Sequence, residues 1–431
     1  RIHILQSGGY GCGAAGDYGM TDILTIDWDD DAPVISKPKI QLRGPQPGWV
    51  DAIEADLKTH TRLLAVAPGG IGKSTVFAFL AARMWARGIR TLVLENRDRL
   101  TRQTAKRLAD ETGLQVEIEM GDEHASPFAP IVVACVQSLG RTNRLTGFAD
   151  DHFGMVVADE CHLSLANQWQ RILNYFHYGA ASLEEEWSAP PDGTYQPKAS
   201  VVGFTASPDI GDRKNLGQFY QKRSVDYTYL EAVEDGWLVG IRQTSIPVKI
   251  DLKKYKARST PTGMDFSTND LSAAMVPIIE ELAEQHAKHA RDKKSIAFLP
   301  SVECARMMTD ALIRRGIKSM FVSGECFDGD EKTEDFVRSG VGTTLCNAMI
   351  YTYGVDFPDV NCIGWYRATV SKAFYIQGIY RGTRVLPGTI DGLLTAEARR
   401  EAIARSAKDI LTILDPLFVS DRIDLMEPYD L

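Results

Sequence analysis

Residues 67 to 75 read Ala-Pro-Gly-Gly-Ile-Gly-Lys-Ser-Thr, and this stretch decides the fold because of what lies on either side of it. The apolar run Leu63–Val66 before it predicts a buried strand, and Val76–Trp85 after it follows a helical pattern. Glycines let backbone N–H groups close around phosphates, a lysine reaches the β and γ oxygens, and a hydroxyl can hold Mg²⁺. The stretch therefore predicts a phosphate-binding loop for a nucleoside triphosphate, with Lys73 on the phosphates and Ser74 on the metal.

All nine residues are candidate nucleotide contacts, namely Ala67, Pro68, Gly69, Gly70, Ile71, Gly72, Lys73, Ser74 and Thr75. Ala67 stands where the strict pattern has glycine, so the alternative is a glycine-rich turn that arose by chance.

The composition describes an ordinary globular protein with two or three domains, since the chain has 431 residues and is 44% hydrophobic. A net charge of −9 does not itself indicate nucleic acid, so any basic binding surface must be local. The seven cysteines lie far apart without C-x-x-C spacing, which predicts reduced thiols and no structural zinc. No apolar run approaches the roughly 18 residues of a membrane span, and no signal-peptide pattern opens the chain. We therefore expect a cytoplasmic protein that makes no membrane contact.

The first 38 residues are interpreted as a flexible tail. The chain begins with Arg1 and its first methionine is Met20, which leaves open that residues 1–19 are not native. Gly11–Gly16 formally matches a dinucleotide-binding pattern, but no helix pattern or second strand follows it before Pro33.

Two series of short apolar runs alternate with amphipathic segments, which predicts α/β folding with parallel sheets. The expected strands are 63–66, 91–94, 131–136, 155–158 and 201–204, and then 244–250, 295–299, 319–322, 343–346, 361–365 and 410–414. Residues 179–198 read as a loop, and 395–408 as a helix before the last strand. With a junction near Gly236–Gly240, we expect one domain over residues 39–236 and a second over 237–431.

The strand at 155–158 ends in two adjacent carboxylates, Asp159 and Glu160. Neighbouring carboxylates are costly unless a cation lies nearby, and Mg²⁺ on a triphosphate is such a cation. Asp159 would hold the metal, while Glu160 would orient and deprotonate the attacking water. A solvated strand end is the alternative.

The segment Asp159-Glu160-Cys161-His162 resembles the DExH box of superfamily-2 helicases and translocases, and other motifs of that family follow in order. Gln46, with Leu42-Arg43, resembles the adenine-reading Q motif. Leu92–Gln103 and Val136–Leu139 resemble segments that contact a nucleic-acid backbone in the family. The resemblance implies nucleic-acid contacts by Arg97, Gln103, Gln137 and Ser138.

Later segments extend the resemblance over roughly residues 41–417. Gly203–Pro208 resembles motif III, which implies that Thr205 and Ser207, together with His162, couple the ATP site to the nucleic acid. Ser295–Ser301 resembles motif IV. Thr352–Asp356 resembles motif V, with Gly354 and Asp356 as nucleotide contacts.

Gln377–Arg384 resembles motif VI and implies catalytic roles for Gln377, Arg381 and Arg384. The two arginines lie three residues apart, which puts both guanidinium groups on one helical face. They can therefore reach from the second domain to a γ-phosphate held by the first. Tyr380 stands where the family has glycine.

The resemblance implies two tandem RecA-like domains, each a mainly parallel sheet flanked by helices, with ATP and Mg²⁺ in the cleft between them. The partner is nucleic acid, DNA favoured over RNA, because the Arg-Gly-Thr-Arg ending looks most like restriction-type and repair-type translocases. The alternatives are an RNA-dependent ATPase, or a motor subunit that serves a separate nuclease or specificity subunit. His286 and His289 are expected to be solvated rather than metal-binding.

Overall fold

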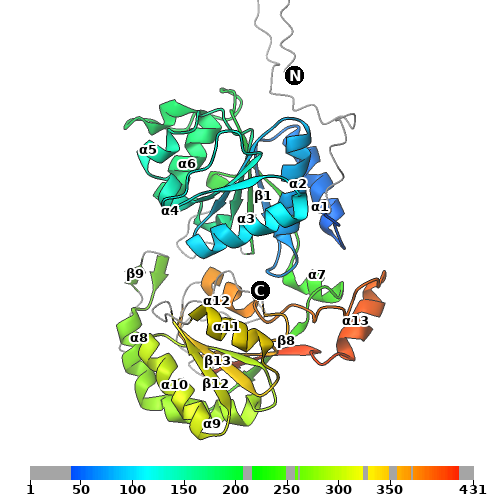
Figure 1. The fold of residues 1–431 in the computed structure, drawn as a ribbon, viewed down its shortest axis with the longest axis vertical. Helices are drawn as coiled ribbons and strands as arrows, with labels where there is room; N and C mark the ends of the chain where they lie inside the picture. Colours follow the sequence, from blue (N-terminus) through cyan, green and yellow to red (C-terminus); the bar gives the residue numbers. More distant parts are fainter. Residues whose placement is uncertain are drawn as a thin grey trace, which may run out of the picture.

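The computed structural model describes residues 40–206, 216–248, 258–260, 263–323, 329–348, 357–369 and 372–416. Figure 1 shows two lobes stacked along the long axis, each a sheet flanked by helices. This confirms the predicted α/β class with two tandem sheets.

The first lobe contains the elements from α1 to η3 and the strand β7, and a short helix, α7, follows it. In chain order these elements are α1 Gln46–Leu57, β1 Arg62–Val66, α2 Lys73–Ala86, β2 Thr91–Glu95, α3 Asp98–Thr112, β3 Val116–Glu119, β4 Ile131–Cys135, α4 Val136–Leu139, α5 Thr142–Leu145, β5 Met155–Asp159, η1 Cys161–Leu163, α6 Asn167–Tyr178, η2 Ala180–Leu183, β6 Ser200–Thr205, η3 Leu216–Gln218, β7 Lys222–Asp226 and α7 Tyr229–Glu234.

The second lobe begins with β8 and ends with β15. Its elements are β8 Gly240–Ser245, β9 Arg258–Thr260, β10 Gly263–Asp265, α8 Thr268–Met275, η4 Val276–Ile278, α9 Ile279–Ala290, β11 Ser295–Phe298, α10 Val302–Arg314, β12 Lys318–Val322, α11 Gly329–Arg338, β13 Thr343–Asn347, β14 Cys362–Trp365, α12 Lys372–Ile379, α13 Ala396–Ala404 and β15 Ile410–Asp415.

Within the described residues, the first lobe's sheet has the strand order β3-β4-β2-β5-β6-β1-β7, with every neighbouring pair parallel. Its central strands are buried on both faces, as near-continuous apolar runs require. Alternate residues of β1 enter opposite cores: Leu63 packs with α1, α2 and α3, whereas Leu64 packs with α4, α5 and α6. The lobe is therefore a three-layer sandwich.

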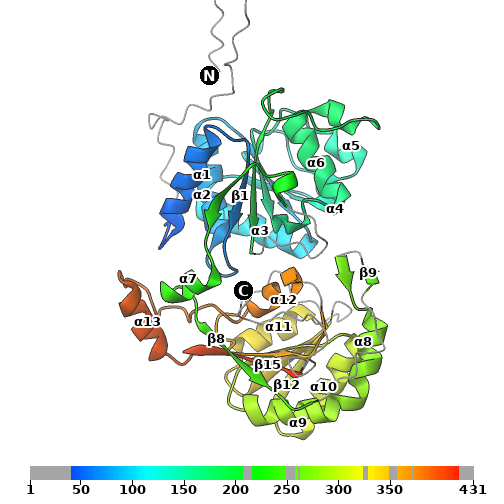
Figure 2. The same cartoon turned by 180° about the vertical axis from the view of Figure 1, so that it is seen from behind.

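The second sheet has the order β12-β13-β11-β14-β15-β8 in the described residues and is also parallel throughout. On β11, Ala297 joins the core formed with α8, α9 and α10, while Ile296 joins the core on the opposite face. The antiparallel β9-β10 hairpin stands on the side that faces the first lobe, as does α12 (Figures 1 and 2).

Three sequence expectations need correction. The strand expected at 244–250 is β8, which spans Gly240–Ser245 and ends there because its partner β15 ends opposite, at Asp415. The edge strands β3 and β7 were missed, since their sequences VEIE and KRSVD carry the charges typical of sheet edges. His286 is fully buried instead of solvated, and its ring nitrogens lie 2.8 Å from the Tyr366 hydroxyl and 3.0 Å from the Thr344 hydroxyl.

The segment 179–198 contains η2 and is otherwise irregular, in agreement with the expected loop. Its Asp192 carboxylate lies 2.6 Å from the buried Arg62 guanidinium, which holds the segment against the first lobe. The helix expected at 395–408 is α13, capped by Thr395 and ending at Ala404. Among the described helices, none has both the length and the apolarity needed to cross a membrane.

Candidate nucleotide-binding site between the lobes

The strand order of the first sheet brings three motif segments to one edge. β5, β6 and β1 are adjacent, with Asp159 opposite Phe204 and Val66 opposite Thr205. The carboxyl ends of parallel strands meet at the same edge of a sheet, where α/β proteins place their ligand sites. The loop after β1, the carboxylates after β5 and the end of β6 therefore converge.

The loop 67–72 has the geometry of an anion cradle. Gly70 and Gly72 have φ values of 84° and 90°, in the left-handed region that favours glycine. A Cβ atom on Gly72 would lie only 2.4 Å from Nε2 of Gln46, so no side chain fits there. The loop delivers the chain to Lys73, the first residue of α2, and the free N–H groups at the start of a helix attract anions.

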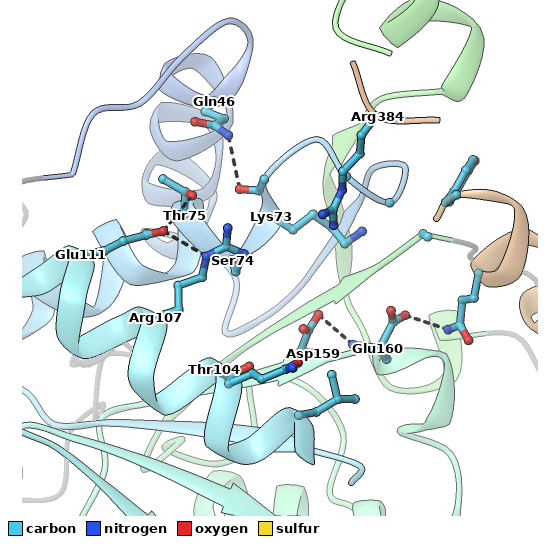
Figure 3. Close-up of a pocket in the computed structure, with 18 of the residues that line it drawn as sticks. Gln46, Lys73, Ser74, Thr75, Thr104, Arg107, Glu111, Asp159, Glu160 and Arg384 are labelled. Carbon is cyan, nitrogen blue, oxygen red and sulfur yellow. Dashed lines mark hydrogen bonds and ion pairs between the residues drawn. The ribbon is translucent and has the colours of Figure 1, made fainter. Parts of the chain in front are cut away.

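Both lobes line one cavity of about 530 Å³, within the range of roughly 300–1,000 Å³ typical of small-molecule sites. The lining residues are Ile40, Gln41, Arg43, Gln46, Gly69, Gly70, Gly72, Lys73, Ser74, Thr75, Leu100, Gln103, Thr104, Arg107, Glu111, Asp159, Glu160 and Ala206 from the first lobe, and Gln377, Tyr380, Arg381 and Arg384 from the second. Ala67, Pro68 and Ile71 do not line this cavity. The three glycines of the loop thus line the cavity. Lys73, Ser74 and Thr75, which follow the loop, line it as well (Figure 3).

The second lobe touches the loop directly. A Cβ on Gly69 would lie 2.8 Å from Cβ of Tyr380, and one on Gly70 would lie 2.7 Å from Cγ of Arg384. Gln377 Nε2 donates a hydrogen bond to Glu160 Oε2 at 3.1 Å. The motif that resembles motif VI therefore closes over the loop, and the glycines are what allow this approach.

Gln46 is buried at the start of α1, and its side-chain amide forms hydrogen bonds with backbone groups. Nε2 donates to the carbonyl oxygens of Ile71 (3.0 Å) and Gly72 (3.3 Å), while Oε1 accepts from Arg43 N–H (2.9 Å). Gln46 thus fixes the phosphate-binding loop, a role that the sequence did not predict.

The two carboxylates at the end of β5 differ in how readily they bind a proton. Burial, with the charge of Glu160, raises the pKa of Asp159 to about 6. Burial alone would raise the pKa of Glu160 too, but the hydrogen bond and charge of His162, followed by the charges of Lys73 and Arg381, lower it to about 2. His162 Nδ1 lies 3.4 Å from Glu160 Oε2. Glu160 is therefore ionised, whereas Asp159 binds a proton more readily and is ionised more completely beside a cation.

A third buried carboxyl, Glu95, lies at the end of β2 next to these two and was missed by the sequence analysis. Burial and the negative charge of Asp159 raise its pKa well above the ordinary value. Thr104 Oγ1 lies 2.5 Å from its Oε1. Its burial therefore favours the protonated form of Glu95 more than in an exposed glutamate.

Cations outnumber anions around the cavity. The cationic side chains are Arg43, Lys73, Arg107, Arg381 and Arg384, against the carboxylates Glu111, Asp159 and Glu160. Burial lowers the pKa of Lys73, whose Nζ donates to the carbonyl oxygens of Ala67 (2.9 Å) and Pro68 (3.2 Å). Burial, with the charges of Arg107 and Arg43, lowers the pKa of Arg384 to about 10. Such a surplus of clustered positive charge favours a polyanionic ligand.

The donor set fits Mg²⁺ carried by a nucleotide. Mg²⁺ takes oxygen ligands and is usually held by one or two carboxylates together with phosphates and water. Asp159 and the Ser74 hydroxyl offer such oxygens at the cavity wall. In the described parts of the chain, no group of three or more His, Cys, Asp or Glu side chains forms a cage for a metal on its own.

The four candidate nucleic-acid residues fall into two groups. Arg97 is the exposed N-cap residue of α3, and Gln137 donates to Asn96 at 2.8 and 3.0 Å, so these residues gather where β2 and β4 end. Ser138 Oγ accepts from Gly121 N–H at 3.1 Å. Gln103 lies elsewhere, in the wall of the cavity, because it is on the face of α3 that turns toward the loop.

The candidate coupling residues His162 and Thr205 are buried side by side, 3.4 Å apart. Ser207, Gly354 and Asp356 lie outside the described residues. Arg107 and Glu111 were missed, although both line the cavity. Their sequence signal is spacing: they follow Gln103 by four and eight residues on one helix.

The chain is similar in sequence and fold to several known proteins. A family model described as "Type III restriction enzyme, res subunit" matches residues 39–210. The chain is 28% identical over 364 residues to Irc3 of Saccharomyces cerevisiae, a candidate ATP-dependent helicase, covering 80% of this chain and 49% of Irc3. It is 27% identical over 332 residues to irc3 of Schizosaccharomyces pombe, a candidate mitochondrial ATP-dependent helicase, covering 75% of this chain and 52% of that protein.

Among solved structures, a fragment of a candidate HsdR subunit of a type I restriction enzyme from Vibrio vulnificus YJ016 superposes with a TM-score of 0.59 at 21% identity. The match covers 87% of this chain and 64% of that one, and it shows the same fold of two tandem domains. The chain spans about half the length of the curated relatives it matches. By these matches and its motif order, the chain is similar to superfamily-2 helicases related to restriction and repair enzymes.

Proposed function

We propose that the chain is the ATP-hydrolysing core of a helicase or translocase that acts on nucleic acid, DNA in preference to RNA. The observation that carries the proposal is the cavity of about 530 Å³ that residues of both lobes line. The phosphate-binding loop and the carboxylates of the first lobe face the arginines of the second across it. A site assembled from two lobes is suited to turnover that depends on closure.

Each side chain in the cavity has a proposed task. The N–H groups of the loop and Lys73 bind the phosphates, Gln46 holds the loop, and Ser74 and Asp159 hold Mg²⁺, which would neutralise charge on the phosphates. Glu160, ionised and oriented by Gln377 and His162, accepts the proton of the attacking water. Arg381 and Arg384 stabilise the charge that develops on the transferred phosphoryl group.

The nucleic-acid strand is proposed to cross the region where β2 and β4 end, near Arg97, Gln137 and Ser138. Backbone contacts of this kind position a strand without reading its sequence, and they weaken as salt rises. Gln103 keeps its predicted nucleic-acid contact as a proposal, and it also lines the nucleotide cavity. His162 and Thr205 lie between the two regions as coupling residues, and Ser207, Gly354 and Asp356 keep the roles that the family resemblance implies.

DNA is favoured because the matching family model is that of a restriction enzyme subunit. An RNA-dependent ATPase remains the second candidate within the superfamily. A motor subunit that moves DNA for a separate nuclease or specificity subunit is compatible with the partial coverage of the longer relatives. The domain limits 39–236 and 237–431 are kept as proposals. The cytoplasmic location also stays a prediction, since one relative is named as mitochondrial.

The test is the ATPase rate of the chain without polymer and with single-stranded DNA, duplex DNA or RNA, at low and moderate salt. Stimulation by DNA that falls with salt is the expected result. Stimulation by RNA alone would transfer the protein to the second candidate. A rate that ignores every polymer, or no ATP hydrolysis at all, would contradict the proposal.

A further inference from the structure

The side of the cavity formed by α3 carries an ion pair that belongs to none of the motifs. Arg107 Nε lies 3.1 Å from Glu111 Oε1, one helical turn away. The same pair reaches the phosphate-binding loop: Arg107 Nη1 donates to Ser74 Oγ at 2.6 Å, and Thr75 Oγ1 donates to Glu111 Oε1 at 3.4 Å. Figure 3 shows both α3 side chains directed at the first turn of α2.

Two features distinguish this pair from an ordinary surface salt bridge. Its members line the nucleotide cavity, and the second carboxylate oxygen of Glu111 is buried without a hydrogen-bond partner among the described residues. The neighbouring pair on α3, Lys106 and Asp110, has the same i, i+4 spacing but is exposed and does not line the nucleotide cavity. The same part of α3 therefore carries two ion pairs with the same charge pattern. We call Arg107–Glu111, at the cavity, the inner pair and Lys106–Asp110, in solvent, the outer pair.

The contact with Ser74 conflicts with the role proposed for that hydroxyl. A guanidinium N–H at 2.6 Å occupies a lone pair of Ser74 Oγ. A divalent cation bound to the same oxygen would meet the Arg107 charge at close range, and like charges repel strongly in a partly desolvated site. Arg107 and the cation are therefore alternative partners of Ser74.

We infer that Arg107, held by Glu111, is a positioning residue that competes with the divalent cation for Ser74. This inference rests on the proposed function. Arrival of the cation releases Arg107 from the loop while its pairing with Glu111 on α3 persists. Because the N-cap of the same helix is Arg97, this exchange links metal binding to the helix that starts at the proposed nucleic-acid path.

The experiment measures ADP binding by calorimetry on the full chain, first in EDTA and then at increasing Mg²⁺. Arg107→Ala is expected to lower the Mg²⁺ concentration needed for half-maximal tightening of ADP binding by about fivefold, the size of one partly exposed charged contact. Glu111→Gln removes a negative charge and frees Arg107, so this variant is expected to need a higher Mg²⁺ concentration for half-maximal tightening of ADP binding. Lys106→Ala and Asp110→Asn, the outer pair, are the matched controls and are expected to leave it unchanged.

A merely structural role would instead weaken ADP binding in both inner-pair variants, together with a lower unfolding temperature. An unchanged or raised Mg²⁺ requirement in Arg107→Ala would overturn the inference, as would equal shifts in the outer-pair variants. If the unaltered chain bound no ADP at any Mg²⁺ concentration, the proposed function itself would fail, which separates the two outcomes.

Discussion

The two lobes have similar parallel sheets but contribute to the cavity in different ways. The first lobe supplies residues from the ends of adjacent strands, from the loop after β1 and from faces of α1 and α3. The second supplies one segment, residues 377–384, at the end of α12 and just beyond it. Ligand binding is therefore built into one lobe, and the other adds charge only when it approaches.

This asymmetry separates binding from turnover. The phosphate contacts are proposed for the first lobe, so variants there should change nucleotide affinity. The arginines of the second lobe are proposed to contact a group that gains charge during reaction, so their loss should change kcat more than affinity. The variants described next test whether nucleotide binding depends on the first lobe and turnover on the second.

The largest effect is expected for Arg384→Ala. The side chain is packed on Gly70 and faces the cavity, and arginines that stabilise phosphoryl transfer contribute roughly 10³–10⁵ to the rate. We expect kcat for ATP hydrolysis to fall about 10⁴-fold. Arg405→Ala, which alters an exposed arginine of the same lobe paired with Glu401, is the control. A loss of less than about tenfold in steady-state assays would remove Arg384 from the reaction.

The next effect concerns Glu160, the ionised carboxylate that is hydrogen-bonded to Gln377. Glu160→Gln keeps the shape and removes the base, so kcat should fall about 10³-fold while ATP binding persists. Single-turnover hydrolysis measures the loss of rate, and equilibrium binding on the same preparation measures whether ATP affinity is kept. Full activity in this variant would sink the assignment of the base.

A smaller effect tests the contact between the lobes. Gly69 does not need a positive φ, but an added Cβ would lie 2.8 Å from Tyr380 Cβ. Gly69→Ala should therefore hinder closure and lower kcat about tenfold, and Tyr380→Gly in the same chain, which removes the opposing Cβ, should restore part of it. Gly48→Ala is the control, because open space surrounds that position. If the double variant showed no rescue, the two residues would not limit closure.

A prediction on stability, separate from catalysis, concerns one buried histidine in each lobe and its response to pH. Burial lowers the pKa of His177 in the first lobe and of His286 in the second to about 4. The unfolded chain has ordinary histidines near 6.5 and binds more protons between pH 4 and 6.5, so the free energy of unfolding falls as pH falls through this window. Each histidine should contribute about 3 kcal/mol to the loss.

Urea unfolding at pH 7, 5 and 4 measures this slope, and His286→Gln should reduce it. His124→Gln, which alters an exposed side chain, is the control. A slope identical in His286→Gln and the unaltered chain would show that the buried ring does not govern acid stability.

The sequence predicted the parts of the molecule that depend on local pattern. Central strands such as β1 and β5 are apolar runs, and the loop, the two carboxylates and the paired arginines follow from chemistry at fixed spacing. Edge strands were missed because β7 is mostly charged and exposed. His286 was misjudged because its helix looks polar, although Ile279, Leu282, Ala283 and Ala290 mark a buried face.

Contacts between distant segments were beyond sequence reasoning. Nothing in the order of residues says that Arg107 meets Ser74, that Gln46 binds the carbonyl groups of the loop, or that Gln103 faces the cavity. These depend on how α1, α2 and α3 pack side by side on one face of the sheet.

The central claim is most directly tested by measuring ATP affinity and turnover for Lys73→Ala and Arg384→Ala in parallel, with the unaltered chain beside them. We predict that Lys73→Ala loses most of its ATP affinity, while Arg384→Ala binds ATP within about threefold of the unaltered chain and fails to hydrolyse it. Equal losses of affinity in both variants, or turnover that survives without Arg384, would contradict the division between a binding lobe and a reacting lobe.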